Sequence, residues 1–339
     1  MSQTGFESLL QYRDAIYAPD LLLCAVTHLD LVTLLSREAL NFEGICQNCA
    51  TYPRPTDVML TLLRAMNILE RENGRYRPTP AAQRYLNANS PDSLVPYYRS
   101  IQNRPQCLEF FEVLKSGKPA GWSSKKDGAD WLSAMQAPDF AQAFTDAMDS
   151  RGKILAEALA EALPMSSHSR LLDIAGGSGI YACKMVDRHP HMQATILEIP
   201  PVDAVAQQSI KDKGFAGRVS VQMGDMFQAL PEGYDVHLFA NVFHDWALDN
   251  LHKLAQNAYS ALPPQGCILV FDAHLNTDKD GPLSVAAYSC LLMHSTLGRC
   301  YGETEITETL CETGFRDCSI LPIAADRSAI LGFKQDAQL

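Results

Sequence analysis

Apolar residues recur at helical spacing through the N-terminal quarter of the chain. In residues 17–35, one helical face would carry Leu21, Leu22, Ala25, Leu29 and Val32. Pro-Thr-Asp at 55–57 signals a helix start, and apolar residues follow at 60, 63, 66 and 69. An Asn-Gly pair at 73–74 predicts a tight turn between two short extended segments. Helices followed by a small hairpin predict a winged-helix domain over residues 1–90.

The pattern changes after Pro164, where short β-like runs alternate with helical patterns. The predicted strands are residues 170–174, 194–198, 219–223, 236–239 and 268–272. Such alternation is typical of a doubly wound parallel sheet. The tail differs, because residues 316–323 and 328–334 predict an antiparallel hairpin. We therefore expect an α/β fold with a Rossmann-like sheet over 164–339, and a helical linker and substrate-pocket region over 91–163.

The first predicted strand of this sheet runs into a glycine-rich turn. Asp173 lies inside the strand, and Gly176, Gly177 and Gly179 lie in the turn before a helix. Glycines there let the backbone approach a ligand, and the helix N-terminus favours anionic or polar groups. The same turn also fits the dinucleotide fingerprint G-x-G-x-x-A, with Glu198 19 residues after Gly179 (198 − 179 = 19). In either case, Glu198 is expected to accept hydrogen bonds from ribose hydroxyls.

A further element favours an adenosyl cofactor other than a dinucleotide. Gly224-Asp225-Met226 follows the third predicted strand. Asp225 would lie near an adenine amino group, and Met226 would pack against the base. A dinucleotide-binding fold does not require this element, nor the acidic residue Asp173 directly before the turn.

The most specific motif is Asn-Val-Phe-His-Asp-Trp at 241–246, after the fourth predicted strand. With the glycine turn, Leu-Glu-Ile-Pro at 197–200 and Thr-Gly-Phe at 313–315, it resembles the S-adenosylmethionine-dependent small-molecule O-methyltransferases of the caffeic acid and acetylserotonin type. The resemblance covers nearly the whole chain. It implies S-adenosyl-L-methionine as cofactor and a homodimer formed through the winged-helix domain.

The resemblance also implies roles for individual residues. His244 would be the general base, and Asp272 and Glu303 would bond to it. Trp246 would flank the adenine, with Asn241 also at the cofactor, and Asp245 would lie beside the substrate. Met148 and Met293 are candidate walls of the acceptor pocket. The abundance of aromatic and sulfur side chains in residues 97–148 and 288–300, Trp131 among them, suits a flat aromatic or polyketide-like hydroxyl compound.

Three positions depart from the family pattern. Ala175 replaces the first glycine of the usual turn, and Ala240 stands where plant members often have lysine. The stretch 297–303 also differs from the family pattern, so Glu305 is the alternative candidate for the acid that bonds to His244. These departures keep open an alternative: a family member that binds the cofactor but performs non-methylating chemistry. The glycine fingerprint likewise leaves an NAD-dependent oxidoreductase as an alternative function.

Charge argues against a general nucleic-acid binder. The chain has 28 basic and 39 acidic side chains, a formal net charge of −11, whereas binding to phosphates needs excess Lys and Arg. Six arginines between residues 51 and 86 against three acids nevertheless keep open a winged-helix DNA-binding regulator.

Other features predict a cytoplasmic protein. No apolar run approaches the ~18 residues of a membrane helix, and residues 1–7 lack a signal-peptide pattern. Ten scattered cysteines fit reduced thiols better than a disulfide framework. Cys46 and Cys49 have zinc-knuckle spacing, but no second pair follows. We expect structural thiols there and no metal site.

Overall fold

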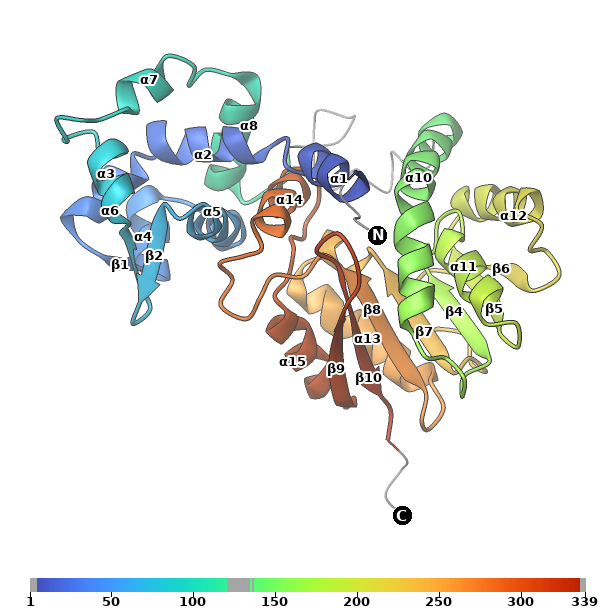
Figure 1. The fold of residues 1–339 in the computed structure, drawn as a ribbon. Helices are drawn as coiled ribbons and strands as arrows, with labels where there is room; N and C mark the ends of the chain where they lie inside the picture. Colours follow the sequence, from blue (N-terminus) through green and yellow to red (C-terminus); the bar gives the residue numbers. More distant parts are fainter. Residues whose placement is uncertain (1–4, 121–134, 136, 336–339) are drawn as a thin grey trace. The chain divides into compact units, whose positions relative to one another are not determined.

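The computed structural model describes residues 5–120, 135 and 137–335, so the predicted pocket residue Trp131 and the predicted loop at 125–128 lie outside the described residues. The chain divides into two compact units (Figure 1). The first comprises residues 1–130 and 275–302, and the second residues 131–274 and 303–339.

The first unit is mostly helical and carries a small three-stranded sheet of order β1-β3-β2. Its helices are α1 (Phe6–Asp14), α2 (Ala18–Thr27), α3 (Leu31–Arg37), α4 (Phe42–Cys49), α5 (Pro53–Ala65), α6 (Pro80–Tyr85), α7 (Val95–Arg99), α8 (Pro105–Ser116) and α14 (Leu283–Ser295). The strands are β1 (Leu40–Asn41), β2 (Leu69–Glu72) and β3 (Arg75–Pro78). Asn73 and Gly74 both have positive φ, as a two-residue hairpin turn requires. The apolar face predicted over 17–35 is divided between two helices, because Asp30 adopts a left-handed conformation before α3.

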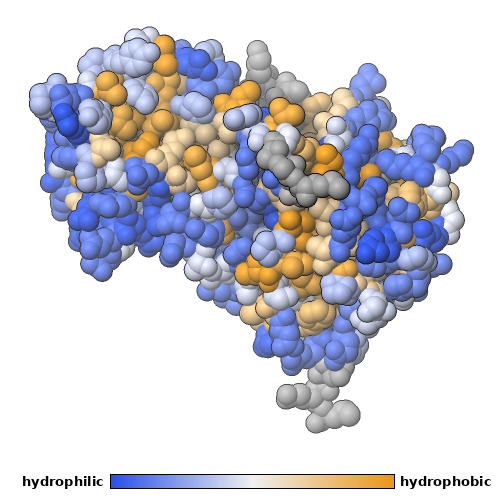
Figure 2. All heavy atoms as spheres, viewed as in Figure 1, coloured by the Kyte–Doolittle hydropathy of each residue, from blue (hydrophilic) through white to orange (hydrophobic). Residues whose placement is uncertain are grey.

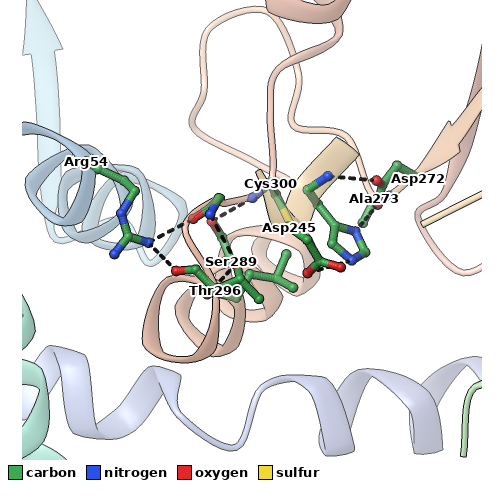
Figure 3. A network of polar contacts seen from close by, with 10 residues as sticks. Arg54, Asp245, Asp272, Ala273, Ser289, Thr296 and Cys300 are labelled. Carbon is green, nitrogen blue, oxygen red and sulfur yellow. Dashed lines mark hydrogen bonds and ion pairs between the residues drawn. The ribbon is translucent and has the colours of Figure 1, made fainter. Parts of the chain in front are cut away.

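One face of α5 binds the segment 275–302 to this unit. Asp57 lies three residues after Arg54 and Arg64 lies seven residues after Asp57, spacings that put all three on one face of the helix. Asp57 accepts from Lys279 Nζ at 2.6 Å, and Arg64 Nη2 lies 3.2 Å from Asp280 Oδ2. The Arg54 guanidinium donates to the carbonyls of Gly117, Met293, Thr296 and Gly298 at 2.9–3.2 Å. Figure 3 shows Arg54 pointing toward Thr296. A segment that follows a strand of the second unit is therefore held in the first by charged side chains of α5.

The second unit is built on a seven-stranded sheet of order β6-β5-β4-β7-β8-β10-β9. The strands are β4 (Arg170–Ile174), β5 (Gln193–Glu198), β6 (Val219–Met223), β7 (Val236–Ala240), β8 (Cys267–Asp272), β9 (Arg316–Pro322) and β10 (Ser328–Phe333). The helices are α10 (Pro138–Ala162), α11 (Ile180–Arg188), α12 (Val202–Asp212), α13 (Leu248–Ala261), α15 (Glu303–Thr313) and the 3₁₀ turn η1 (Phe243–Asp245). Strands β4 to β8 pair in parallel, and β10 pairs antiparallel with β8 and β9. The predicted fold class, including the C-terminal hairpin, is confirmed.

The strand order fixes where a ligand site can form. The chain proceeds from β4 outward through β5 to β6, then returns to β7 on the other side of β4. Right-handed crossovers in opposite directions put α11 and α13 on opposite faces of the sheet. The gap between the carboxyl ends of β4 and β7 is the switch point at which ligands bind in such sheets. The glycine turn follows β4 and the His-Asp-Trp segment follows β7.

By length and composition, no single helix in the described part of the chain meets the requirements for crossing a membrane; α1–α2 (6–27) and α3 meet them only as a pair bent by 49°.

Candidate functional site

The glycine turn after β4 holds a buried carboxyl group. Asp173 is completely buried, and its Oδ2 accepts from the backbone N–H of Ala182 at 3.2 Å. An added Cβ at Gly176 would lie 2.6 Å from the Asp173 carboxyl, so this position tolerates only glycine without movement of that side chain. Oδ1 of Asp173 has no hydrogen-bond partner among the described residues. Burial raises the pKa of Asp173 to about 7.

Three residues of the turn after β4 have left-handed backbone conformation, at the positions where the family pattern has glycine. Gly177 (φ +57°) and Gly179 (φ +73°) both lie in this region, and so does Ala175 (φ +55°). The alanine therefore takes the conformation that glycine would adopt, at a steric cost of roughly 1–2 kcal/mol. At Gly179, an added Cβ would also lie 2.2 Å from Ile196 Cδ1. The expectation that Ala175 alters the approach of the backbone to a ligand stays a prediction.

Glu198 ends β5 and is held on the glycine turn. Its Oε1 accepts from Gly177 N–H at 2.9 Å, and its Oε2 from Ile199 N–H at 3.0 Å. The carboxyl group is buried, and burial raises its pKa to about 7 even though these two N–H groups act in the opposite direction. Each oxygen keeps a further lone pair for a ligand hydroxyl.

The segment after β6 lies against the segment after β7 through two aromatic rings. Asp225 is exposed, and its Oδ1 accepts from Phe227 N–H at 2.9 Å. The rings of Phe227 and Trp246 meet edge to face with centroids 4.7 Å apart. Asn257 on α13 donates to the Met226 carbonyl at 3.0 Å and so fixes this loop. Thus Asp225, Met226 and Trp246 belong to one local structure, while the contribution of Phe227 was missed from the sequence.

Asn241 follows β7 and turns the chain into the His-Asp-Trp segment. It has positive φ (+57°), and its Nδ2 donates to the Tyr181 hydroxyl at 3.0 Å. Tyr181 is buried on α11, directly behind the glycine turn. This hydrogen bond joins the loops after β4 and β7, and no sequence motif indicated it.

The centre of the site is a buried histidine–carboxylate pair. His244 lies in η1, and its Nδ1 is 2.5 Å from Oδ1 of Asp272, the last residue of β8. The backbone N–H of Ala273 also donates to this oxygen at 2.8 Å. Because a carboxylate can only accept, the hydrogen-bond network assigns a proton to Nδ1 of His244.

A second carboxyl group faces the other ring nitrogen. Oδ1 of Asp245 lies 3.6 Å from Nε2 of His244. Burial would lower the pKa of His244, but the charges of Asp272 and Asp245 and the hydrogen bond to Asp272 raise it above its usual value. Burial and the charge of Asp272 raise the pKa of Asp245. The pair of carboxyl groups therefore favours the protonated imidazole.

The roles of three further predicted site residues are not tested by their local surroundings. Glu303 is the first residue of α15, and its carbonyl accepts from the Thr307 hydroxyl at 2.8 Å; among the described residues, its carboxyl group makes no hydrogen bond or ion pair to His244. Met148 is half-buried on α10, and Met293 is buried on α14 of the first unit. Their roles stay predictions.

His274 was missed by sequence reasoning. It follows β8 two residues after Asp272, is buried, and its Nδ1 lies 2.8 Å from the Ser328 hydroxyl on β10. Burial lowers the pKa of His274 to about 4, so it stays neutral beside the charged pair. The sequence offered one indication that His274 lies near the site, namely its position two residues after Asp272 at the end of a predicted strand.

No group of three or more His, Cys, Asp or Glu side chains is placed to hold a metal ion within the residues that the structure describes.

Known proteins are similar to this chain along most of its length. A model of the O-methyltransferase domain matches residues 112–316, and a model of the O-methyltransferase dimerisation domain matches residues 10–88. The chain is 29% identical to the tetracenomycin polyketide synthesis 8-O-methyl transferase of Streptomyces glaucescens, over 97% of each chain. It is 29% identical to the L-tyrosine C(3)-methyltransferase of Streptomyces lavendulae, over 86% of this chain and 82% of that one.

Among solved structures, the fold is similar to an O-methyltransferase family 2 protein from Planctomyces limnophilus in complex with apigenin. That structure has a TM-score of 0.89 and 28% identity, and the match covers 98% of this chain and 97% of the other.

Proposed function

Because this chain belongs to the S-adenosylmethionine-dependent O-methyltransferase family, we propose that it methylates a hydroxyl of a small aromatic or polyketide-like metabolite, with His244 as the general base. The observation that carries the proposal is the buried pair of His244 and Asp272, with Nδ1 and Oδ1 2.5 Å apart at the carboxyl edge of the sheet. The pair fixes the tautomer and leaves Nε2 to accept a proton.

The residues after β4 and β5 fit the family's cofactor. The buried Oδ1 of Asp173 has no described partner, and Gly176 leaves open the space beside it that a Cβ would fill. Glu198 is fixed by two backbone N–H groups and keeps acceptor capacity for ribose hydroxyls. We propose that the cofactor is held by Asp173, Gly176, Gly177, Gly179, Glu198, Asp225, Met226, Asn241 and Trp246. When bound, S-adenosylmethionine supplies an electrophilic methyl group on a positively charged sulfur.

The protein's own task is to remove the acceptor's proton. A phenol has a pKa of about 10 and histidine about 6.5, so complete deprotonation before reaction would cost roughly 5 kcal/mol. We infer that Nε2 of His244 takes the proton as the new bond forms. Asp272 at Nδ1 and Asp245 at 3.6 Å from Nε2 stabilise the imidazolium that results, which reduces this cost.

The acceptor class is supported by the relatives. One relative acts in tetracenomycin polyketide synthesis, and the similar solved structure contains apigenin. We propose Asp245, Met148 and Met293 as acceptor contacts. A histidine base favours a hydroxyl acceptor, although the relative that methylates C(3) of L-tyrosine makes carbon the alternative atom to test.

A homodimer is the second part of the proposal. The chain carries the family's dimerisation domain over residues 10–88. Figure 2 shows apolar side chains on the exposed surface of the first unit, in the area that Figure 1 gives to α2, α7 and α8. Large exposed apolar residues of this unit include Leu9, Tyr12, Ile16, Tyr97 and Ile101. Exposed apolar area of this kind is typical of protein–protein interfaces.

A DNA-binding role for the winged helix has no comparable support. The arginines that suggested it are bound to the protein itself: Arg54 and Arg64 hold the 275–302 segment. Arg77 pairs with Glu70 and Glu72, Arg84 pairs with Asp92, Arg75 donates to the Ala39 carbonyl, and Arg71 lies over the Tyr76 ring. A DNA-binding surface needs cations free to neutralise phosphates.

A cytoplasmic location is also proposed. All ten cysteines are free thiols, including Cys46 and Cys49, which suits a reducing compartment.

The test combines binding with chemistry. Calorimetry with S-adenosylhomocysteine should show one site per chain, and labelled S-adenosylmethionine should methylate apigenin or a related polyketide phenol in a screen. His244→Ala should abolish transfer but retain binding, whereas the control His252→Ala, at an exposed ion pair with Glu312, should retain both. Full activity of His244→Ala would refute the general base. Absence of S-adenosylhomocysteine binding, or NAD binding instead, would refute the cofactor assignment.

A further inference from the structure

Two cysteine sulfurs meet at the junction of α15 and β9. Sγ of Cys311, in the last turn of α15, lies 3.7 Å from Sγ of Cys318 on β9. Cys311 is the single exposed cysteine of the ten, and Cys318 is partly buried. The disulfide S–S bond is ~2.05 Å long, so a small approach of the two sulfurs would join them.

The backbone between the two cysteines is held in place. The N–H of Phe315 donates to the Leu310 carbonyl and the N–H of Gly314 to the Cys311 carbonyl, both at 3.1 Å. With Gly314 at φ +120°, these bonds form a Schellman cap that ends α15. Arg316 Nη1 donates to the carbonyls of Cys311 and Phe315 at 2.9 and 2.8 Å. The two sulfurs are therefore positioned by a fixed turn.

Space for the inner sulfur is provided by the neighbouring strand. A Cβ added at Gly332 on β10 would lie 3.3 Å from Cys318 Sγ, so the absence of a side chain there leaves room for the thiol. The register of β10 against β9 also shifts between Leu331 and Phe333, beside this glycine. The sulfur of Cys318 therefore has the space that it needs beside Gly332, while Cys311 is exposed to solvent.

We propose that Cys311 and Cys318 form a dithiol modification site, which low-molecular-weight disulfides of the glutathione type oxidise to an intramolecular disulfide. The Cys311 thiolate attacks one sulfur of oxidised glutathione, the S–S bond breaks, and one glutathione leaves and takes up a proton. Cys318 then loses its proton and attacks the Cys311 sulfur, which releases the second glutathione. The two protein thiols lose two electrons and two protons, and glutathione disulfide is reduced to two thiols.

The order of attack follows from the environment. Burial, followed by the hydrogen bond with Cys311, raises the pKa of Cys318 to about 12, so this thiol stays protonated at neutral pH. Exposure makes Cys311 the sulfur that an external disulfide reaches first.

The experiment uses the full-length protein in glutathione buffers of increasing oxidised fraction, followed by alkylation and peptide mapping. We expect Cys311 and Cys318 to lose alkylation together, with their joined peptides lighter by two hydrogens, and recovery after reduction. Cys318→Ser should instead accumulate a glutathione mixed disulfide on Cys311, and Cys311→Ser should leave Cys318 as a thiol.

The matched control is Cys46→Ser/Cys49→Ser, which removes the other closely spaced pair and should not change the reaction. Because the mapping is done on the unaltered protein, it does not depend on the folding of any variant. If both thiols of the unaltered protein are alkylated at every ratio, or if Cys318 reacts equally well in Cys311→Ser, the proposal is overturned. Neither readout involves methyl transfer.

Discussion

Nδ1 of His244 lies 2.5 Å from Oδ1 of Asp272, and the two side chains are 5% and 2% exposed. A charge pair so well shielded from water interacts more strongly than one at the surface. The charge of His244 and their hydrogen bond hold the pKa of Asp272 below its usual value despite burial, so this carboxyl group stays ionised beside the base. The pH dependence of methyl transfer should therefore report on this pair.

Asp272→Asn should lower activity and move its pH profile. His244 must be neutral to accept a proton, so activity rises with pH through a His244 pKa that lies above its usual ~6.5. Removing the negative charge of Asp272 lowers that pKa, which shifts the acidic limb to lower pH. We expect kcat to fall roughly 10²- to 10⁴-fold. The measurement is kcat against pH, with Asp249→Asn on the exposed surface of α13 as control. An unmoved acidic limb would contradict the assigned pair.

Gly176→Ala should weaken cofactor binding. The new Cβ would lie 2.6 Å from the Asp173 carboxyl, which must then move into or away from the proposed cofactor site. We expect affinity for S-adenosylhomocysteine to fall about tenfold or more, equivalent to at least about 1.4 kcal/mol. Gly217→Ala is the matched control, because an added Cβ there meets nothing within 4 Å. Equal affinities of the two variants in calorimetry would show that Asp173 and Gly176 do not define the site.

Arg54→Gln should destabilise the first unit. The guanidinium donates to four backbone carbonyls of Gly117 and the 293–298 segment, and the shorter amide cannot reach them all. Carbonyls left without a partner cost about 1–3 kcal/mol each when buried, so a loss of roughly 2–3 kcal/mol is expected. Urea unfolding provides the measurement, with the exposed Arg99→Gln as control. A change as small as that of the control would mean that other contacts hold the segment.

His237→Leu should stabilise the second unit, especially in acid. His237 is completely buried in β7, and neither ring nitrogen has a partner among the described residues. Burial lowers its pKa to about 3. Between pH 6.5 and about 3, the unfolded chain binds a proton that the folded chain does not, so stability falls as pH falls, by up to about 1.4 kcal/mol per pH unit.

The leucine variant removes both this acid sensitivity and the unpaired polar atoms, for a gain of about 1–3 kcal/mol at pH 7.5. Unfolding in urea at pH 7.5 and pH 5 tests both effects. His252→Leu, at an exposed position, should change stability at pH 7.5 by less than about 0.5 kcal/mol. A destabilised His237→Leu would indicate that the ring nitrogens have an essential partner.

Local patterns in the sequence determined much of this protein. Alternating β and helical runs predicted every strand of the large sheet to within a residue or two, because strand periodicity and turn residues act over a few neighbours. They also placed Asp173, Glu198 and Asp272 at or beside the ends of parallel strands, and such ends meet at one edge of a sheet. The distance between His244 and Asp272 had to await the fold.

Other features were decided by tertiary structure alone, because they depend on contacts between side chains that the sequence pattern does not reveal. The break at Asp30 divided a continuous apolar pattern into two helices. The arginines of α5, a basic cluster in the sequence, bind carbonyls and carboxylates more than 200 residues away, which assigns 275–302 to the first unit. The contact of Cys311 with Cys318 exists because a Schellman cap reverses the chain between them. A sequence specifies which groups are present, whereas packing decides which of them meet, because partners of a buried polar group are chosen by the whole fold.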